Sequence, residues 1–350
     1  VPMFQAAEEL GVLDSMGLGA SYFDNLTMQA IFQPIIGQTS GILYCHQCPD
    51  NEINDWLVQE TVARHGAPPD LFHADGMNAA ILVVEAIKAT EGDMSAATLI
   101  LTLEGMEFEG PKGTVYIRPE DHVAIQDMYI VKLVNLDDPE FKFYEVMGTT
   151  RPEPPCLLPE GMQDRCGDLP VGSLAEMPPE PEPPAGLTCD EPIKIGLISD
   201  LTGGLSIYGT MIEQSFLLGM EYVAGAPGTD NVFMVDDCEV EVLLRDDQGS
   251  AETTATLARE LIEVDEVDML VGTVSSGSTA TLQEIALEND VVLIVAPAAA
   301  NDITGINFND HTFRTSRENY QDSINLCEYL ADQYETFIQI APDYSFGYGG

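Results

Sequence analysis

Residues 193–204, IKIGLISDLTGG, decide the fold class. The first seven residues are nearly all apolar and lack polar alternation, which predicts a strand that is buried on both faces. A turn of polar and glycine residues begins at Asp200, and an apolar pattern of helical period follows it. A buried strand that is followed directly by a helix is typical of a parallel α/β sheet.

The same alternation continues through the rest of the chain. We expect a doubly wound parallel sheet with helices on both faces, joined by right-handed crossovers. The expected strands are residues 193–199, 240–245, 267–274, 291–296, 312–315 and 336–340. The expected helices are residues 211–223, 251–264, 278–288 and 318–334.

Residues 1–150 also carry the patterns of a folded segment. Helices are expected at 51–66, at 73–90 and at 95–104, where Ser95 would be the cap. Strands are expected at 112–118 and 128–133.

Residues 151–192 differ from both neighbouring segments, because 11 of the 22 prolines lie there. The run MPPEPEPP at 177–184 excludes a helix or a central strand. Proline stiffness and repulsion between the acidic groups predict a semi-rigid linker. The domain organisation is therefore residues 1–150, a linker at 151–192, and residues 193–350.

The chain of 350 residues has 59 acidic and 13 basic side chains, for a formal net charge of −46. This charge excludes nucleic acid as a partner and disfavours anionic membrane surfaces, because both require basic side chains. Solubility, calcium or a salty medium each account for the charge. No apolar run approaches the roughly 20 residues of a membrane span. The sequence begins at Val1 without a signal peptide, as expected of a fragment or a mature form.

The seven cysteines predict disulfides and therefore an oxidising compartment, although the sequence fixes no pairing. Because their number is odd, one thiol stays free or pairs outside the chain. Cys45 and Cys48 form a C-x2-C, but the second C-x2-C of a zinc site is missing. No metal or other cofactor is expected, and the histidines show no metal spacing.

Ligands of an open parallel sheet bind beyond the carboxyl ends of its strands. After the strand at 267–274, Ser275 and Ser276 begin a helix in the sequence SSGST. Hydroxyls and free N–H groups at a helix start form a neutral anion site. The alternative is that Ser278 only caps the helix. The acidic pairs Asp236-Asp237 and Asp246-Asp247 are expected to be solvated turns, although the second follows a strand on the ligand edge.

Enzymatic chemistry finds no support in these motifs. The serine cluster lacks the Walker A pattern and the Gly-x-Ser-x-Gly nucleophile elbow. We therefore expect a binding protein and not an enzyme.

Several motifs of residues 193–350 together resemble the amino-terminal lobe of type I periplasmic binding proteins, the leucine/isoleucine/valine-binding class of ABC transporters. They are Lys194-Ile195-Gly196 through Thr202-Gly203, Tyr208-Gly209, Val271-Gly272 with Ser275-Ser276, Ala296-Pro297-Ala298-Ala299, Phe313-Arg314-Thr315, and Asp343-Tyr344 through Gly347. Residues 1–150 resemble the carboxyl-terminal lobe through Glu104-Gly105-Met106, Pro111-Lys112-Gly113 and Ile117-Arg118-Pro119-Glu120-Asp121-His122.

The lobes thus occur in reversed order along the chain. The simplest account, and the one we expect, is a tandem protein whose first module ends at 150 and whose second begins at 193. The rival account is a circular permutation in which the two lobes close on each other.

The resemblance also implies a set of ligand-binding residues. Ser276 would bind a ligand carboxylate, together with Ser275 and with the backbone of Ala298 and Ala299. Tyr208 would cover the apolar part of the ligand, and Phe346 would line the pocket from the hinge. Amino acid binders commonly have threonine at the position of Ala300, so alanine leaves room for another small carboxylate or an amide.

The resemblance implies a solute-binding protein of an ABC importer, with a membrane permease as its partner. The location would be periplasmic or extracellular, with an anchor, if there is one, outside these residues. The alternative is the ectodomain of a sensory receptor with the same fold, since fold alone does not determine function. A transmembrane and signalling segment would distinguish the receptor.

Overall fold

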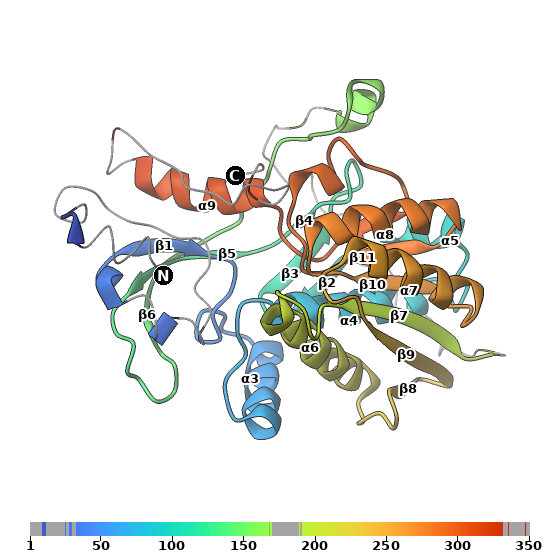
Figure 1. The fold of residues 1–350 in the computed structure, drawn as a ribbon, viewed down its shortest axis with the longest axis horizontal. Helices are drawn as coiled ribbons and strands as arrows, with labels where there is room; N and C mark the ends of the chain where they lie inside the picture. The colour runs from blue at the N-terminus through green and yellow to red at the C-terminus, as the bar shows by residue number, and fades with distance from the viewer. Residues whose placement is uncertain are drawn as a thin grey trace.

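The computed structural model describes residues 33–167 and 191–331, together with residues 9–11, 25, 28–29, 169, 189, 335 and 347. Its largest sheet consists of β7 (Ile193–Ser199), β8 (Val232–Val235), β9 (Cys238–Asp246), β10 (Met269–Gly272), β11 (Val292–Val295) and β12 (Thr312–Arg314). The strand order is β12-β11-β10-β7-β9-β8 (Figure 1). All neighbouring strands are parallel except β8 and β9, which are antiparallel.

Both faces of this sheet are covered by helices. Successive strand residues point to opposite faces, and apolar side chains on each face pack against a different set of helices. Leu197 lies in one apolar core with α4 (His73–Ala89) and α6 (Ser206–Ala224). Its neighbour Ile198 lies in another core with α7 (Ala251–Glu263) and α8 (Ser276–Glu288). The predicted doubly wound parallel sheet is confirmed. The strand expected at 336–340 lies outside the described residues.

The first part of the chain is built differently from a second parallel sheet. Its described strands form two antiparallel sheets, with the orders β1-β5-β6 and β2-β3-β4. These strands are β1 (Thr39–Ile42), β2 (Glu107–Gly110), β3 (Gly113–Ile117), β4 (Ala124–Ile125), β5 (Met128–Leu133) and β6 (Tyr144–Thr150). The expected helices are present as α3 (Glu52–His65), α4 and α5 (Ala96–Leu103). Ser95 is at the N-cap of α5, but its hydroxyl donates to the side chain of Thr98 and caps no backbone N–H.

The two parts of the chain share one hydrophobic core. Helix α4 of the first part packs along α6 of the second, and both contribute to the core that covers one face of the large sheet. The ring of Trp56 lies 5.1 Å from that of Tyr222, which adds an aromatic contact between the parts. Contact of this kind is required if the two parts close on each other. The domain division at residues 151–192 stays a prediction.

Helix α6 begins five residues earlier than the predicted start at residue 211. Tyr208 and Gly209, expected in the loop, therefore lie in its first turn. A β-carbon on Gly209 would lie 1.7 Å from the carbonyl oxygen of Asp200, so only glycine lets the helix start this close to the strand end.

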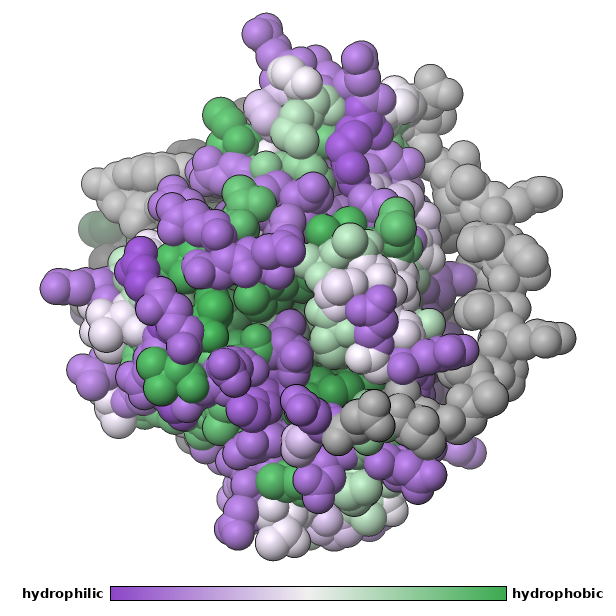
Figure 2. Space-filling view, turned by 90° about the vertical axis from the view of Figure 1, so that its right-hand side faces the viewer, coloured by the Kyte–Doolittle hydropathy of each residue, from purple (hydrophilic) through white to green (hydrophobic). Residues whose placement is uncertain are grey.

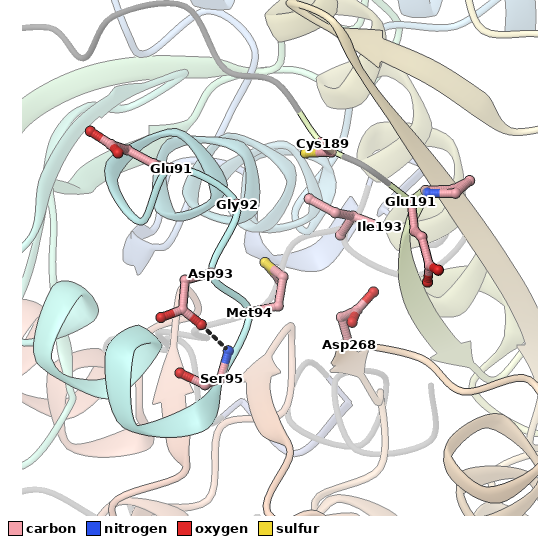
Figure 3. A pocket seen from close by; sticks show the side chains of 10 residues that line it. Glu91, Gly92, Asp93, Met94, Ser95, Cys189, Glu191, Ile193 and Asp268 are labelled. Atoms are coloured by element: carbon pink, nitrogen blue, oxygen red, sulfur yellow. Dashed lines mark hydrogen bonds between the residues drawn. The ribbon is translucent and has the colours of Figure 1, made fainter.

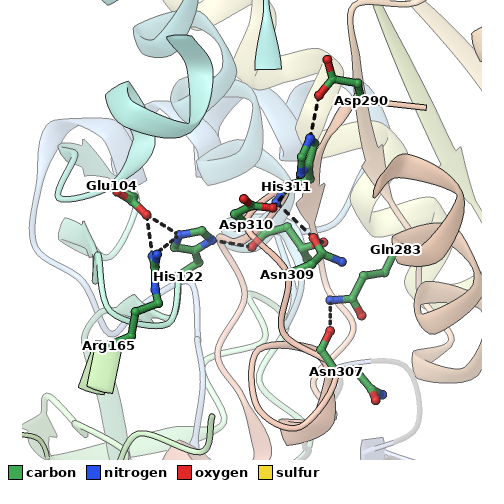
Figure 4. Close-up of polar contacts among 10 residues, drawn as sticks. Glu104, His122, Arg165, Gln283, Asp290, Asn307, Asn309, Asp310 and His311 are labelled. Carbon is green, nitrogen blue, oxygen red and sulfur yellow. Dashed lines mark hydrogen bonds and ion pairs between the residues drawn. The ribbon is translucent and has the colours of Figure 1, made fainter. Parts of the chain in front are cut away.

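The segment after β6 is ordered where no secondary structure was expected. It contains a 3-10 helix, η3 (Glu160–Cys166), and Arg165 at its end donates to Glu104 and to the carbonyl oxygen of Pro119. His122 lies 3.1 Å from Glu104 (Figure 4). It also contacts the carbonyl oxygen of Thr312 at 2.9 Å. This network links the start of the predicted linker to both parts of the chain.

Three disulfides join Cys45 to Cys48, Cys156 to Cys166 and Cys189 to Cys238. Cys327 is the free, exposed thiol that the odd number requires. Among the described helices, none has the length and apolar character needed to cross a membrane.

Candidate ligand-binding site

Two loops meet at the carboxyl edge of the large sheet. One follows β10 and leads into α8, and the other follows β11. The Ser276 hydroxyl at the start of α8 accepts a hydrogen bond from the N–H of Ala300 at 3.2 Å. Both residues are buried, with 4% and 2% of their surfaces exposed. The structure thus brings together two predicted site residues that are 24 positions apart.

The start of α8 differs by one turn from the alternative expected from sequence. Its N-cap is Ser275, whose hydroxyl accepts from the N–H of Ser278 at 3.4 Å, so the hypothesis that Ser278 caps the helix is wrong. Ser278 is fully buried, and its hydroxyl has no hydrogen-bond partner among the described residues. Ser278 lies in the serine cluster but was not predicted as a ligand-binding residue.

The carbonyl groups of the second loop are held by donors at the end of β12 and after it. Arg314 donates to the carbonyl oxygen of Ala298 at 2.7 Å and to that of Ala300 at 2.6 Å. The Ala299 carbonyl accepts from the N–H of Asn319 at 2.9 Å. Each carbonyl of this alanine loop, residues 298–300, therefore accepts a hydrogen bond from within the protein.

Tyr208 contacts an aromatic ring of the first part of the chain. Its ring meets that of Phe72 edge to face, with centroids 5.1 Å apart. The guanidinium of Arg317 lies 5.5 Å from the centre of the Phe72 ring and donates to the carbonyl oxygen of Pro297 at 3.2 Å. Phe72 and Arg317 were missed because no local pattern shows that they meet. Phe346 lies outside the described residues.

Three aspartates, Asp200, Asp246 and Asp247, lie beside this edge, with carboxylate oxygens within 4.8 Å of one another. All three accept hydrogen bonds from the protein. Asp200 holds the N–H groups of Gly203 and Leu205, and Asp247 holds the hydroxyls of Thr254 and Thr273. Through these bonds the three carboxylates stabilise the turns that follow β7 and β9.

The prediction that both acidic pairs lie in solvated turns is correct for one pair and wrong for one residue of the other. Asp236 and Asp237 are exposed in a turn, as predicted. Asp247 is fully buried, so the prediction of a solvated turn is wrong for it. Burial alone would raise the pKa of Asp246, but bonds from the Thr202 hydroxyl and the Leu201 N–H lower it overall.

A separate cavity of about 620 Å³ opens at the opposite end of the sheet, beside the start of β7 and the residue before β10. Its lining includes the carboxylates of Glu91, Asp93, Glu191 and Asp268 (Figure 3). A view from the side shows a mainly hydrophilic surface around a central apolar hollow (Figure 2). Because acidic groups dominate the whole chain, an acidic lining does not single out this cavity, and the candidate site remains the carboxyl edge.

A parallel sheet with binding loops at its carboxyl edge defines an α/β ligand-binding fold. The chain belongs to the periplasmic binding protein family, whose sequence pattern matches residues 1–138 and 192–350. It is of type I, as the resemblance predicted. Members of this family bind solutes and are not enzymes, in agreement with the expectation.

The chain is similar to named relatives over part of its length. It is 30% identical over 112 residues to the leucine-, isoleucine-, valine-, threonine-, and alanine-binding protein of Pseudomonas aeruginosa, covering 32% of this chain and 28% of that protein. It is 23% identical over 138 residues to Leu/Ile/Val-binding protein homolog 3 of Brucella melitensis, covering 39% and 35%. The chain thus matches about a third of the length of such relatives.

A solved structure of an ABC-type branched-chain amino acid transporter from Rhodopseudomonas palustris is also similar. It is 34% identical, with a TM-score of 0.34, and the match covers 38% of this chain and 34% of that one.

Proposed function

We propose that this chain is part of an extracytoplasmic solute-binding protein of an ABC importer. Its solute would be a branched-chain amino acid or a similar small carboxylate or amide, passed to a membrane permease. The names of the relatives in Pseudomonas and Brucella support this solute class. Three disulfides support a periplasmic or extracellular location, because such bonds persist in oxidising compartments.

The observation that carries the proposal is the contact between Ser276 and the N–H of Ala300. Both groups are buried at the start of a 13-residue helix, where the helix dipole favours an anion. The Ser276 hydroxyl, whose oxygen accepts from the Ala300 N–H, can donate its own proton to a carboxylate at this position without an arginine in the site. The alanine at position 300 offers no hydroxyl, which favours solutes that need fewer donors.

We infer that residues 1–150 and 193–350 act together as one module in permuted order. The support is the core that α4 shares with α6 and with one face of the large sheet. A pair of incomplete tandem modules would give no reason for this packing.

The experiment that tests the function is a thermal shift of the full chain with leucine, isoleucine, valine and small carboxylates or amides. A solute that binds only the folded state adds about 2.7 kcal/mol at a hundredfold excess over Kd. We expect a rise in Tm that is lost in Ser276→Ala.

The matched control is Ser250→Ala. Ser250 is the N-cap of α7, a helix of the same 13-residue length that follows strand β9 of the same sheet. This variant should keep the full shift. A well-folded chain that shows no shift with any solute would contradict the proposal.

A further inference from the structure

Arg314 at the end of β12 has an unusual environment. Its side chain is fully buried, and its three donor groups go to neutral acceptors. They are the carbonyl oxygens of Ala298 and Ala300, at 2.7 and 2.6 Å, and the Thr304 hydroxyl at 3.0 Å. No carboxylate lies within ion-pair distance of Arg314 in the described part of the chain, although the charges of Glu318 and Asp121 are close enough to raise its pKa against the effect of burial.

Burial of a charged guanidinium among neutral acceptors does not by itself favour the folded state. Burial lowers the pKa of Arg314 to about 10, so the guanidinium still carries its charge at neutral pH. Buried charges can often be replaced by well-packed apolar side chains without loss of stability. A contribution to stability therefore does not explain why arginine stands at position 314. Its guanidinium binds three acceptors in a fixed arrangement, which suggests that it sets the conformation of the loop.

The geometry follows from the planarity of the peptide group. In a trans peptide the C=O and the following N–H point in opposite directions. Since the Ala298 carbonyl points to Arg314, the N–H of Ala299 points away from it. The Ala299 carbonyl is held by Asn319, and the N–H of Ala300 correspondingly reaches Ser276 at 3.2 Å. Among the described residues, the N–H of Ala299 has no hydrogen-bond partner.

We propose that Arg314 is a positioning residue for the ligand site. By fixing the carbonyls of Ala298 and Ala300, it holds the loop in the conformation in which the N–H of Ala299 is left for the carboxylate of the solute and the N–H of Ala300 binds Ser276. The ligand part of this inference rests on the proposed function, whereas the effect of Arg314 on the loop does not.

The test is Arg314→Lys, which keeps the charge but cannot reach three acceptors with one ammonium group. Amide hydrogen exchange at Ala299 and Ala300, measured by NMR without ligand, should become about tenfold faster, as expected for the loss of a charged hydrogen bond. Exchange at Leu270 in β10 and Leu293 in β11 should be unchanged. Calorimetric titration with leucine should show an affinity that is about tenfold lower.

Arg118→Lys is the matched control. Arg118 is also buried and donates to Asp121 and to the carbonyl oxygen of Pro154, with no hydrogen bond to residues 298–300. It should leave exchange at Ala299 and Ala300 and the leucine affinity within about twofold of the wild type, even if it lowers Tm. If Arg314→Lys does not fold, Thr304→Val removes a single acceptor and should give a change of about threefold.

The exchange measurement tests the role of Arg314, and the titration tests leucine as the solute, so each hypothesis can be contradicted without the other. Unchanged exchange at both alanines in a folded variant would overturn the role of Arg314. Faster exchange in a chain whose wild type binds no leucine would support Arg314 as the residue that fixes the loop and would count against leucine as the solute.

Discussion

Gly219 of α6 lies directly against Ala80 of α4. A β-carbon on Gly219 would come within 2.7 Å of the Ala80 methyl and 3.1 Å of the Met77 carbonyl oxygen. The close approach is possible only for glycine, and it joins residues that are far apart in the chain. We predict that Gly219→Val lowers the free energy of unfolding by about 1–3 kcal/mol, the usual cost of overpacking a core. Urea unfolding measures this change.

Gly204→Ala is the control for that substitution, because a β-carbon there meets nothing within 4 Å. It should change stability by less than about 0.5 kcal/mol. If Gly219→Val were equally neutral, α4 and α6 would not be packed together in solution, and the one-module arrangement would fail.

The disulfides should differ in their contributions to stability. Cys189 and Cys238 are 49 positions apart, whereas Cys45 and Cys48 are 3 apart. A longer closed loop removes more entropy from the unfolded chain. We predict a loss of about 4 kcal/mol for the serine pair at 189 and 238, and about 2 kcal/mol for the pair at 45 and 48. Urea unfolding without reductant measures both, and equal losses would argue against the loop-length effect.

Much of the large sheet could be predicted from sequence, because buried strands form continuous apolar runs between amphipathic helices. The boundaries of β7 agree with the prediction, and those of α7 differ by one residue at the end. Strand β8 was missed, since its four residues pair with β9 across a turn at Asp236 and Asp237 that breaks the helix-strand alternation.

Sequence could predict only those parts of the candidate site that lie in loops of one sheet. The serine cluster and the alanine loop follow strands of a parallel sheet, so their meeting could be expected from topology. The contact between Phe72 and Tyr208 joins the two parts of the chain, which no periodicity indicates. The cap of α8 was misplaced because helix starts are poorly fixed by pattern alone.

Glu318 should make stability depend on pH. Burial raises its pKa from 4.5 to about 7, although Arg314 and Arg118 beside it act to lower the pKa and Asp121 to raise it. Between these pH values the unfolded chain has lost a proton that the folded chain keeps, so this contribution to stability is lost as pH rises. Relative to the wild type, Glu318→Gln should gain up to about 3 kcal/mol between pH 4.5 and pH 8.

Urea unfolding of both proteins at each pH isolates this effect. Glu284→Gln on α8, an exposed site, provides the reference for losing one negative charge. A difference between Glu318→Gln and the wild type that stays constant from pH 4.5 to pH 8 would show that the buried carboxyl does not titrate in this range.

The acidic surface should make the chain more stable in concentrated salt. With 59 acidic and 13 basic groups, repulsion between like charges outweighs the attraction of the ion pairs. Raising KCl from about 0.1 M to about 1 M shortens the screening length from roughly 10 Å to roughly 3 Å. We predict that Tm rises over this range and that EDTA does not change it, because the carboxylates of Asp200, Asp246 and Asp247 already accept protein donors. A Tm that responds to micromolar calcium but not to KCl would instead favour calcium as the reason for the charge.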